Sequence, residues 1–256
     1  MSTPAAVEAY VLHRYPYQES SLVVELFTLA EGRVGAVARG ARRPKSQFAR
    51  LQPWQPYLVS WRGRGDLVTL TGAEDSGPLV QLKGIAVACG FYLNELLIRL
   101  LQRWDPHPGL YAAYQGALAA LAAGEAPDWV LRRFEFRLLQ EIGFGFDLSG
   151  CIQCGRPLLA DASPWLYLPE QGLICAEHGG EGQPTCRGSA LRALEGGAEM
   201  PPASDKRVIR QWLQGALATQ LGGKPLQSQA LLQVYRRPGR LSGGGQENVL
   251  GEDSDD

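Results

Sequence analysis

The hydrophobic pattern of this chain changes period once, near residue 80, and that change divides the expected fold into two parts. Before the change, five short segments alternate apolar and polar residues or are rich in β-branched residues, as β-strands are. These segments are VEAYVLHRY (7–15), SSLVVELFTL (20–29), RVGAVARG (33–40), QPYLVSW (55–61) and DLVTLTG (66–72). Five short strands predict a small barrel over residues 1–80, either an OB-fold or an SH3-like barrel.

After Gly84 the apolar residues recur three and four positions apart, which predicts helices. The expected helices span residues 85–104, 110–124, 128–143, 204–223 and 228–237. Ser204 or Asp205 is expected to cap the fourth of them. We therefore expect an α+β multidomain chain, in which residues 81–148 and 187–237 form a helical domain around an insert at residues 149–186.

The insert carries a spacing typical of metal ligands, Cys151-x-x-Cys154 followed by Cys175-x-x-His178. Each pair can present two ligands from one turn, and two pairs complete a tetrahedron around Zn²⁺. Four protein ligands would close the site, so its predicted role is structural. The fourth ligand is the uncertain one, because Cys186 lacks the spacing that His178 has. The other interpretation is a loop-rich insert with free cysteines.

Positive charge is concentrated on the predicted barrel. The segment Arg33–Gly65 has a net charge of +8 and no acid, so the remainder of the chain carries −9. Cations in a loop that contains Gly and Pro can follow a phosphate backbone, and the alternative is a solvated face. Nearby, Phe48 and Trp61 are either base-stacking rings or barrel core. The candidate polyanion contacts are Arg39, Arg42, Arg43, Lys45, Arg50, Arg62 and Arg64.

An adjacent pair, Arg132 and Arg133, lies among apolar residues of the third expected helix. An exposed helix face is the simpler interpretation on physical grounds. The functional interpretation is a groove that captures an acidic peptide with an apolar end, and Glu135 is placed to pair with an arginine of a neighbouring turn.

No catalytic motif is found: the chain has no GxSxG, no P-loop and no HExxH. It also has neither a signal-peptide pattern nor an apolar run long enough to span a bilayer, so we expect a soluble, cytoplasmic protein that is not an enzyme. Residues 238–256 are rich in Gly and acid, and we expect a disordered tail that aids solubility or folds back on the basic barrel.

Taken together, these segments resemble the RecO family of bacterial DNA repair and recombination mediators. The resemblance runs through VLHRYPYQESSLVVELFT (11–28), GRVGAVARGARRPKSQFARLQPW (32–54), GFYLNELLIRLL (90–101), LRRFEFRLLQEIGFGFDLSGC (131–151) and LGGKPLQSQALL (221–232). It implies an N-terminal OB-fold, a helical domain and a zinc-finger-like insert.

The resemblance also implies a function in the RecF pathway. Proteins of this family bind single- and double-stranded DNA and anneal complementary strands at the bacterial nucleoid. They act with RecR, and in many bacteria RecF, to load RecA onto strands coated by the single-strand-binding protein (SSB), whose acidic C-terminal tail they contact. The alternative is a zinc-containing adaptor that binds other proteins and no DNA.

The family's motifs assign roles to some residues. Arg39, Arg42, Arg43 and Lys45 match its basic loop and become the leading DNA contacts, and Arg132 becomes the candidate for the SSB tail, with Arg133 as the alternative. Where this chain has His178, the family pattern has a cysteine, which implies a weaker affinity for zinc. No cofactor other than zinc is implied.

Overall fold

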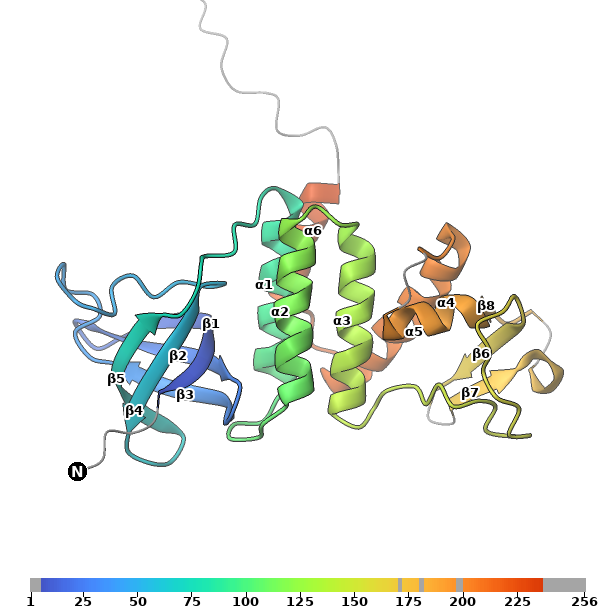
Figure 1. Ribbon diagram of the computed structural model, residues 1–256, viewed down its shortest axis with the longest axis horizontal. Coiled ribbons are helices and arrows are strands. Elements are labelled where there is room, and N and C mark those ends of the chain that lie inside the picture. The colour runs from blue at the N-terminus through green and yellow to red at the C-terminus, as the bar shows by residue number, and fades with distance from the viewer. Residues whose placement is uncertain (1–5, 170–171, 180–181, 197–199, 237–256) are drawn as a thin grey trace, which may run out of the picture.

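The chain is arranged as three consecutive parts: a barrel at one end, helices in the middle and a small sheet at the other end (Figure 1). This computed structural model describes residues 6–169, 172–179, 182–196 and 200–236. The predicted tail at 238–256 lies outside the described residues. Over the described ranges, no helix combines the length and hydropathy that crossing a bilayer needs.

The five predicted strands are confirmed and form a closed barrel in the order β1-β2-β3-β5-β4. Neighbouring strands run antiparallel except β3 and β5, which are parallel. A closed five-stranded barrel of this order is an OB-fold, and this excludes the SH3-like alternative. The strands are Val7–Tyr17 (β1), Ser21–Thr28 (β2), Gly32–Ala38 (β3), Pro56–Arg62 (β4) and Leu67–Asp75 (β5).

Alternation along β2 sends side chains to two different cores. Val24 and Leu26 point into the barrel, whereas Phe27 points outward and packs against the helical domain. There the Phe27 ring centroid lies 5.4 Å from that of Tyr111 and 6.0 Å from that of Tyr114. The helical domain therefore covers one part of the outer face of the barrel.

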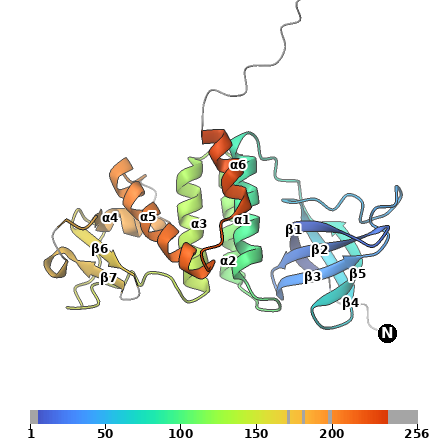
Figure 2. The same cartoon turned by 180° about the vertical axis from the view of Figure 1, so that it is seen from behind.

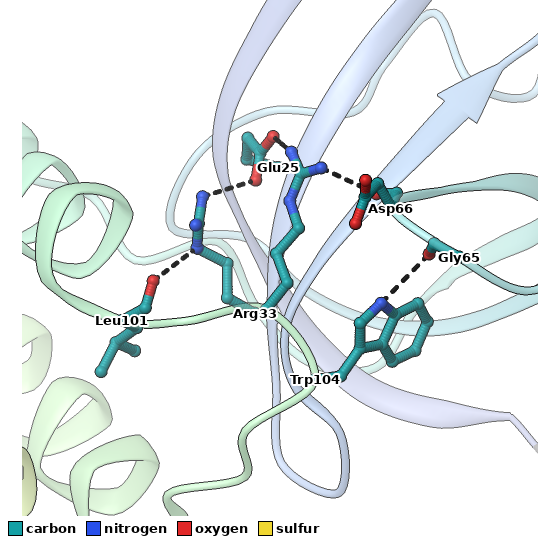
Figure 3. Close-up of polar contacts among 7 residues, drawn as sticks. Glu25, Arg33, Gly65, Asp66, Leu101 and Trp104 are labelled. Atoms are coloured by element: carbon teal, nitrogen blue, oxygen red, sulfur yellow. Dashed lines mark hydrogen bonds and ion pairs between the residues drawn. The ribbon is translucent and has the colours of Figure 1, made fainter.

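A buried carboxylate joins the barrel to the segment that follows the first helix (Figure 3). Glu25 accepts a hydrogen bond from Arg33 Nη1 at 3.2 Å and a second one from Arg103 Nη2. Arg33 Nε also donates to the carbonyl of Leu101 at 3.1 Å. In the same segment, Trp104 donates its indole N–H to the carbonyl of Gly65, in the hairpin between β4 and β5.

The helical domain is built around three long helices, with α6 lying alongside α1 (Figure 2). Proline at the first position starts both α2 and α3, and Gly124 and Gly143 follow their ends with positive φ. The helices are Ile85–Leu100 (α1), Pro108–Ala122 (α2), Pro127–Glu141 (α3), Gly188–Arg192 (α4), Ala203–Gln220 (α5) and Gln227–Arg236 (α6), with single 3₁₀ turns at Ala176–His178 and Ala193–Glu195.

The first helix is shorter than the apolar pattern predicts. It ends at Leu100 instead of residue 104, because Leu101 is extended and Trp104 has a φ of 62°. The residues beyond the helix end contact the barrel instead: the backbone N–H of Trp104 donates to the carbonyl of Arg33.

The cap predicted for the fourth expected helix is wrong. This helix, α5, begins at Ala203 after Pro202, and no side chain caps it. Asp205 is used differently, because its carboxylate accepts a hydrogen bond from Arg187 Nε at 2.8 Å. That ion pair ties the end of the insert to α5.

The insert forms a three-stranded antiparallel sheet in the order β7-β6-β8. Its strands are Pro164–Leu168 (β6), Gly172–Cys175 (β7) and Cys186–Arg187 (β8). Pairing of Cys186 with Trp165 places that cysteine in the sheet.

We expect Glu25→Ala to lower the free energy of unfolding by about 2–3 kcal/mol, because it leaves two guanidinium groups without their shared, largely buried acceptor. Chemical denaturation measures the loss. The matched control is Arg50→Ala, which removes an exposed partner of Asp75 at 4.0 Å and should change stability by less than about 0.5 kcal/mol. Equal effects of the two substitutions would contradict the structural role of Glu25.

Candidate metal centre, basic loop and arginine pocket

The four predicted metal ligands come together in the insert. The ligand atoms of Cys151, Cys154, Cys175 and His178 all lie within 4.8 Å of one another. The Sγ atoms of Cys154 and Cys175 are 3.8 Å apart, and His178 Nδ1 lies 3.2 Å from Cys175 Sγ. A tetrahedral zinc with bonds of about 2.3 Å to sulfur separates its sulfurs by about 3.8 Å. The donor set fits a zinc-type ion and leaves no fifth protein ligand in the described group.

The backbone of the insert positions these ligands. The N–H of Gly155 bonds to the carbonyl of Cys151 at 2.8 Å and closes the first turn, and Gly155 has a φ of 72°. Burial opposes ionisation of Cys151, but hydrogen bonds from surrounding backbone N–H groups outweigh it and lower its pKa to about 6. The thiolate, which is the form that binds metal, is thereby favoured.

Cys186, the alternative fourth ligand, lies outside this cluster. Its thiol points to its neighbour's backbone, 3.6 Å from the carbonyl of Arg187. Burial, and next the charge of Asp205, raise the pKa of Cys186 far above its usual value. It is a neutral side chain of the sheet, and the geometry selects His178.

The basic loop, residues 39–55, leaves β3 and is held by apolar anchors. Ala41, Phe48 and Leu51 are buried in the barrel core, and the backbone N–H of Arg42 bonds to the carbonyl of Ser20. Phe48 is therefore core and not a stacking ring. Arg39, just before the first anchor, is exposed, and so are Arg42, Arg43 and Lys45 between Ala41 and Phe48.

The hairpin between β4 and β5 presents the other predicted cations. Arg62 and Arg64 are exposed beside Gly63 and Gly65, which have φ values of 97° and 98°. Trp61 is half-buried against the barrel core, with its ring 6.1 Å from that of Trp104. The last predicted cation, Arg50, is exposed 4.0 Å from Asp75.

Arg132 is buried, so the interpretation of its position as an exposed helix face is wrong. Its Nη2 donates a hydrogen bond to Glu135 Oε1. Glu135 Oε2 is buried and has no hydrogen-bond partner in the described residues. Glu135 Oε1 also accepts a 2.6 Å hydrogen bond from the hydroxyl of Tyr92. Burial raises the pKa of Glu135, and the charge of Arg132 opposes that rise.

Arg132 also lies at the wall of a pocket of about 350 Å³ between α1, α3, α5 and α6. Its Nε and Nη1 atoms are buried without hydrogen-bond partners in the described residues. The pocket contains two further cations, Arg210 and Lys224, and the described residues that line it include no acid. Its apolar lining includes Leu131, Leu217, Leu221, Pro225, Leu226 and Leu232.

The helix α6 is positioned against this pocket by α1. The carboxylate of Glu95 accepts the backbone N–H groups of Gln227 and Ser228 at 2.9 and 2.8 Å, at the start of α6. Arg133, in contrast, is exposed and lines a different hollow between α2 and α3. Sequence reasoning missed Arg210 and Lys224, because only folding brings them next to Arg132.

The barrel, the helical domain and the Cys₃His cluster define a class: OB-fold proteins with a helical domain and a zinc-finger-like insert. Two family models match the chain: "Recombination protein O N terminal" over residues 1–78 and "Recombination protein O C terminal" over residues 81–230.

Similar proteins agree with these matches. The DNA repair protein RecO of Acidithiobacillus ferrooxidans is 42% identical over 241 residues, which cover 93% of this chain and 94% of the relative. The DNA repair protein RecO of Nitrosococcus oceani is 46% identical over 240 residues, which cover 91% and 95%. The chain belongs to the RecO family of DNA repair and recombination proteins.

We expect close to one zinc per chain in freshly purified native protein, by elemental analysis, and loss of the metal from Cys175→Ser, because three ligands hold zinc less tightly than four. The matched control is Cys89→Ala, which alters a cysteine of α1 outside the cluster and should keep the metal. Wild-type protein without metal, or unchanged metal in Cys175→Ser, would contradict the site.

Proposed function

We propose that this chain is a recombination mediator of the RecF pathway that binds single- and double-stranded DNA and anneals complementary strands. With RecR it would help to load RecA onto single strands coated by SSB. The observation that carries the proposal is the basic loop: four exposed cations on an OB-fold barrel in a chain of the RecO family. RecF and RecA are proposed as further partners, and the bacterial nucleoid as the place of action.

Phosphate contacts are the proposed role of the basic loop and of the β4–β5 hairpin. The loop is anchored at Ala41, Phe48 and Leu51, so its cations extend from a rigid base. The hairpin is tied by the indole of Trp104 and by Arg103, which donates to the carbonyl of Asp66 at 2.8 Å. Binding through phosphates does not depend on base sequence and weakens steeply with salt.

The pocket of Arg132 is the proposed site for the acidic C-terminal tail of SSB. Two unpaired guanidinium nitrogens, together with Arg210 and Lys224, favour carboxylates, and the leucines of the pocket favour an apolar end group. Because Arg132 and Arg133 line different hollows, the geometry favours Arg132.

The proposed activity requires no covalent chemistry. Annealing needs two strands to be held close together with their charges neutralised, which the exposed cations can do. Structural zinc is proposed for the Cys₃His cluster, where it would hold the insert together.

We expect Arg42→Glu combined with Arg43→Glu to weaken binding of single- and double-stranded DNA alike, for all base sequences. The double variant should also flatten the dependence of log K on log salt by roughly 1.4 for single strands, since each lost phosphate contact removes roughly 0.7. Titrations with labelled oligonucleotides at several salt concentrations measure both effects.

The matched control is Lys206→Glu with Arg207→Glu, an equal change of charge on α5. If the control weakened binding as much as the loop variant does, net charge and not the loop would be responsible. Wild-type protein that binds no DNA at low salt would reject the DNA function and favour the protein-binding adaptor.

We expect Arg132→Ala to abolish binding of an acidic SSB-tail peptide and to leave DNA binding unchanged, because pocket and barrel are separate. Fluorescence anisotropy of the labelled peptide measures the loss. Lys224→Glu tests the same pocket without touching the buried Arg132–Glu135 pair, and Arg133→Ala is the control that should bind normally. Normal peptide binding by both Arg132→Ala and Lys224→Glu would place the tail elsewhere.

A further inference from the structure

The strand register places five side chains in one row across the outer face of the barrel. Tyr15 of β1 lies opposite Val23 of β2, which lies opposite Val37 of β3. Val37 pairs in turn with Thr69 of β5, and Thr69 pairs with Arg62 of β4. Directly paired residues point to the same side of a sheet, so these five form a continuous strip.

This strip points away from the barrel core. Val24, Ala36 and Val68, which lie next to the strip along β2, β3 and β5, belong to that core, so alternation turns the strip outward. Tyr15 is 42% exposed, and Val23, Val37 and Thr69 are half-buried, so the strip is accessible and largely apolar.

A second ring lies against Tyr15. The centroid of the His13 ring is 4.3 Å from that of Tyr15, with 56° between the planes. Both residues follow an irregularity in the β1–β2 pairing between Val11 and His13. The irregularity shifts the alternation, so that His13 is exposed directly after the buried Leu12. The two rings, tilted against each other, lie together on the outside of the barrel.

The neighbouring row contains a carboxylate whose charge is balanced by two arginines. His13 is opposite Glu25, Glu25 is opposite Gly35, and Arg33 and Arg103 neutralise Glu25. The guanidinium of Arg103 lies directly over Gly35, where a Cβ atom would be 2.8 Å from it. A side chain at residue 35 would have to displace this cation from its present position.

Both sides of the strip are bordered. On one side, beyond the row of Glu25, the row that contains Phe27 is covered by the helical domain. On the other side β3 leads into the basic loop at Arg39, and the loop is tied to the β1–β2 turn through Arg42 and Ser20. Cations therefore lie at the edges of an aromatic and apolar surface. Proteins that bind single-stranded nucleic acids through base stacking use this arrangement.

We propose that this strip is a platform on which the bases of a single strand stack, with Tyr15 and His13 as the stacking rings. The inference rests on the proposed DNA binding and assigns phosphate contacts and base contacts to two different surfaces. The basic loop holds the phosphates of single and double strands alike, whereas Tyr15 contacts only unpaired bases, because bases inside a duplex do not expose their faces.

The test compares three probes of equal length: a single-stranded oligonucleotide, a duplex and an abasic single strand with the same phosphates. We expect Tyr15→Ala to weaken binding of the single strand by roughly 5- to 150-fold. It should change duplex binding by less than about twofold and reduce the difference in affinity between the single strand and the abasic strand. Tyr15→Phe keeps a stacking ring and should bind like wild type.

The matched control is Phe144→Ala, which removes a 53% exposed ring near the insert and should change none of the three affinities. An unchanged affinity of Tyr15→Ala for the single strand would overturn the platform and would favour a protein as the partner that binds the strip. Equal losses for single strand, duplex and abasic strand would also overturn it. Wild-type protein that binds none of the probes would instead reject the proposed DNA function itself.

Discussion

The buried carboxylate of Glu25 holds the barrel and the helical domain in one arrangement. Its two arginine partners come from different places, Arg33 from β3 and Arg103 from the segment after α1. Burying a carboxylate is costly unless its oxygens are paired, so both arginines are needed where they are. Arg103 and Trp104 also donate to backbone carbonyls of the β4–β5 hairpin, so the same segment fixes that hairpin beside the helical domain.

This arrangement separates three surfaces along the chain. The outer face of the barrel carries the cations and the aromatic strip, the helical core carries the pocket of Arg132, and the insert carries the Cys₃His cluster. The pocket is built from four helices, and Glu95 positions the last of them. In the proposed function, two separate surfaces would let the chain engage a DNA strand and the protein that coats it at the same time.

Local patterns predicted much of the fold, because they are set by neighbouring residues. Alternation predicted the five strands, and the spacing of Cys151, Cys154, Cys175 and His178 predicted the cluster. The family resemblance, and not the residue pattern, singled out Arg132. Its burial was not predictable, because it depends on Glu135 and Tyr92, and Tyr92 lies on another helix.

What the sequence could not predict depends on long-range pairing. The helical pattern continues through residue 104, yet the chain leaves the helix at Leu100 because Arg103 and Trp104 bind the barrel. Phe48 lies in a basic loop and still belongs to the core. The outward position of Tyr15 becomes visible only when the register of all five strands is known.

The most direct measurement is the rate at which complementary strands anneal, with and without SSB on them. The account predicts that the protein accelerates annealing of both bare and SSB-coated strands, and that Arg132→Ala keeps the first activity and loses the second. No acceleration of bare strands would contradict DNA annealing as the function of this chain.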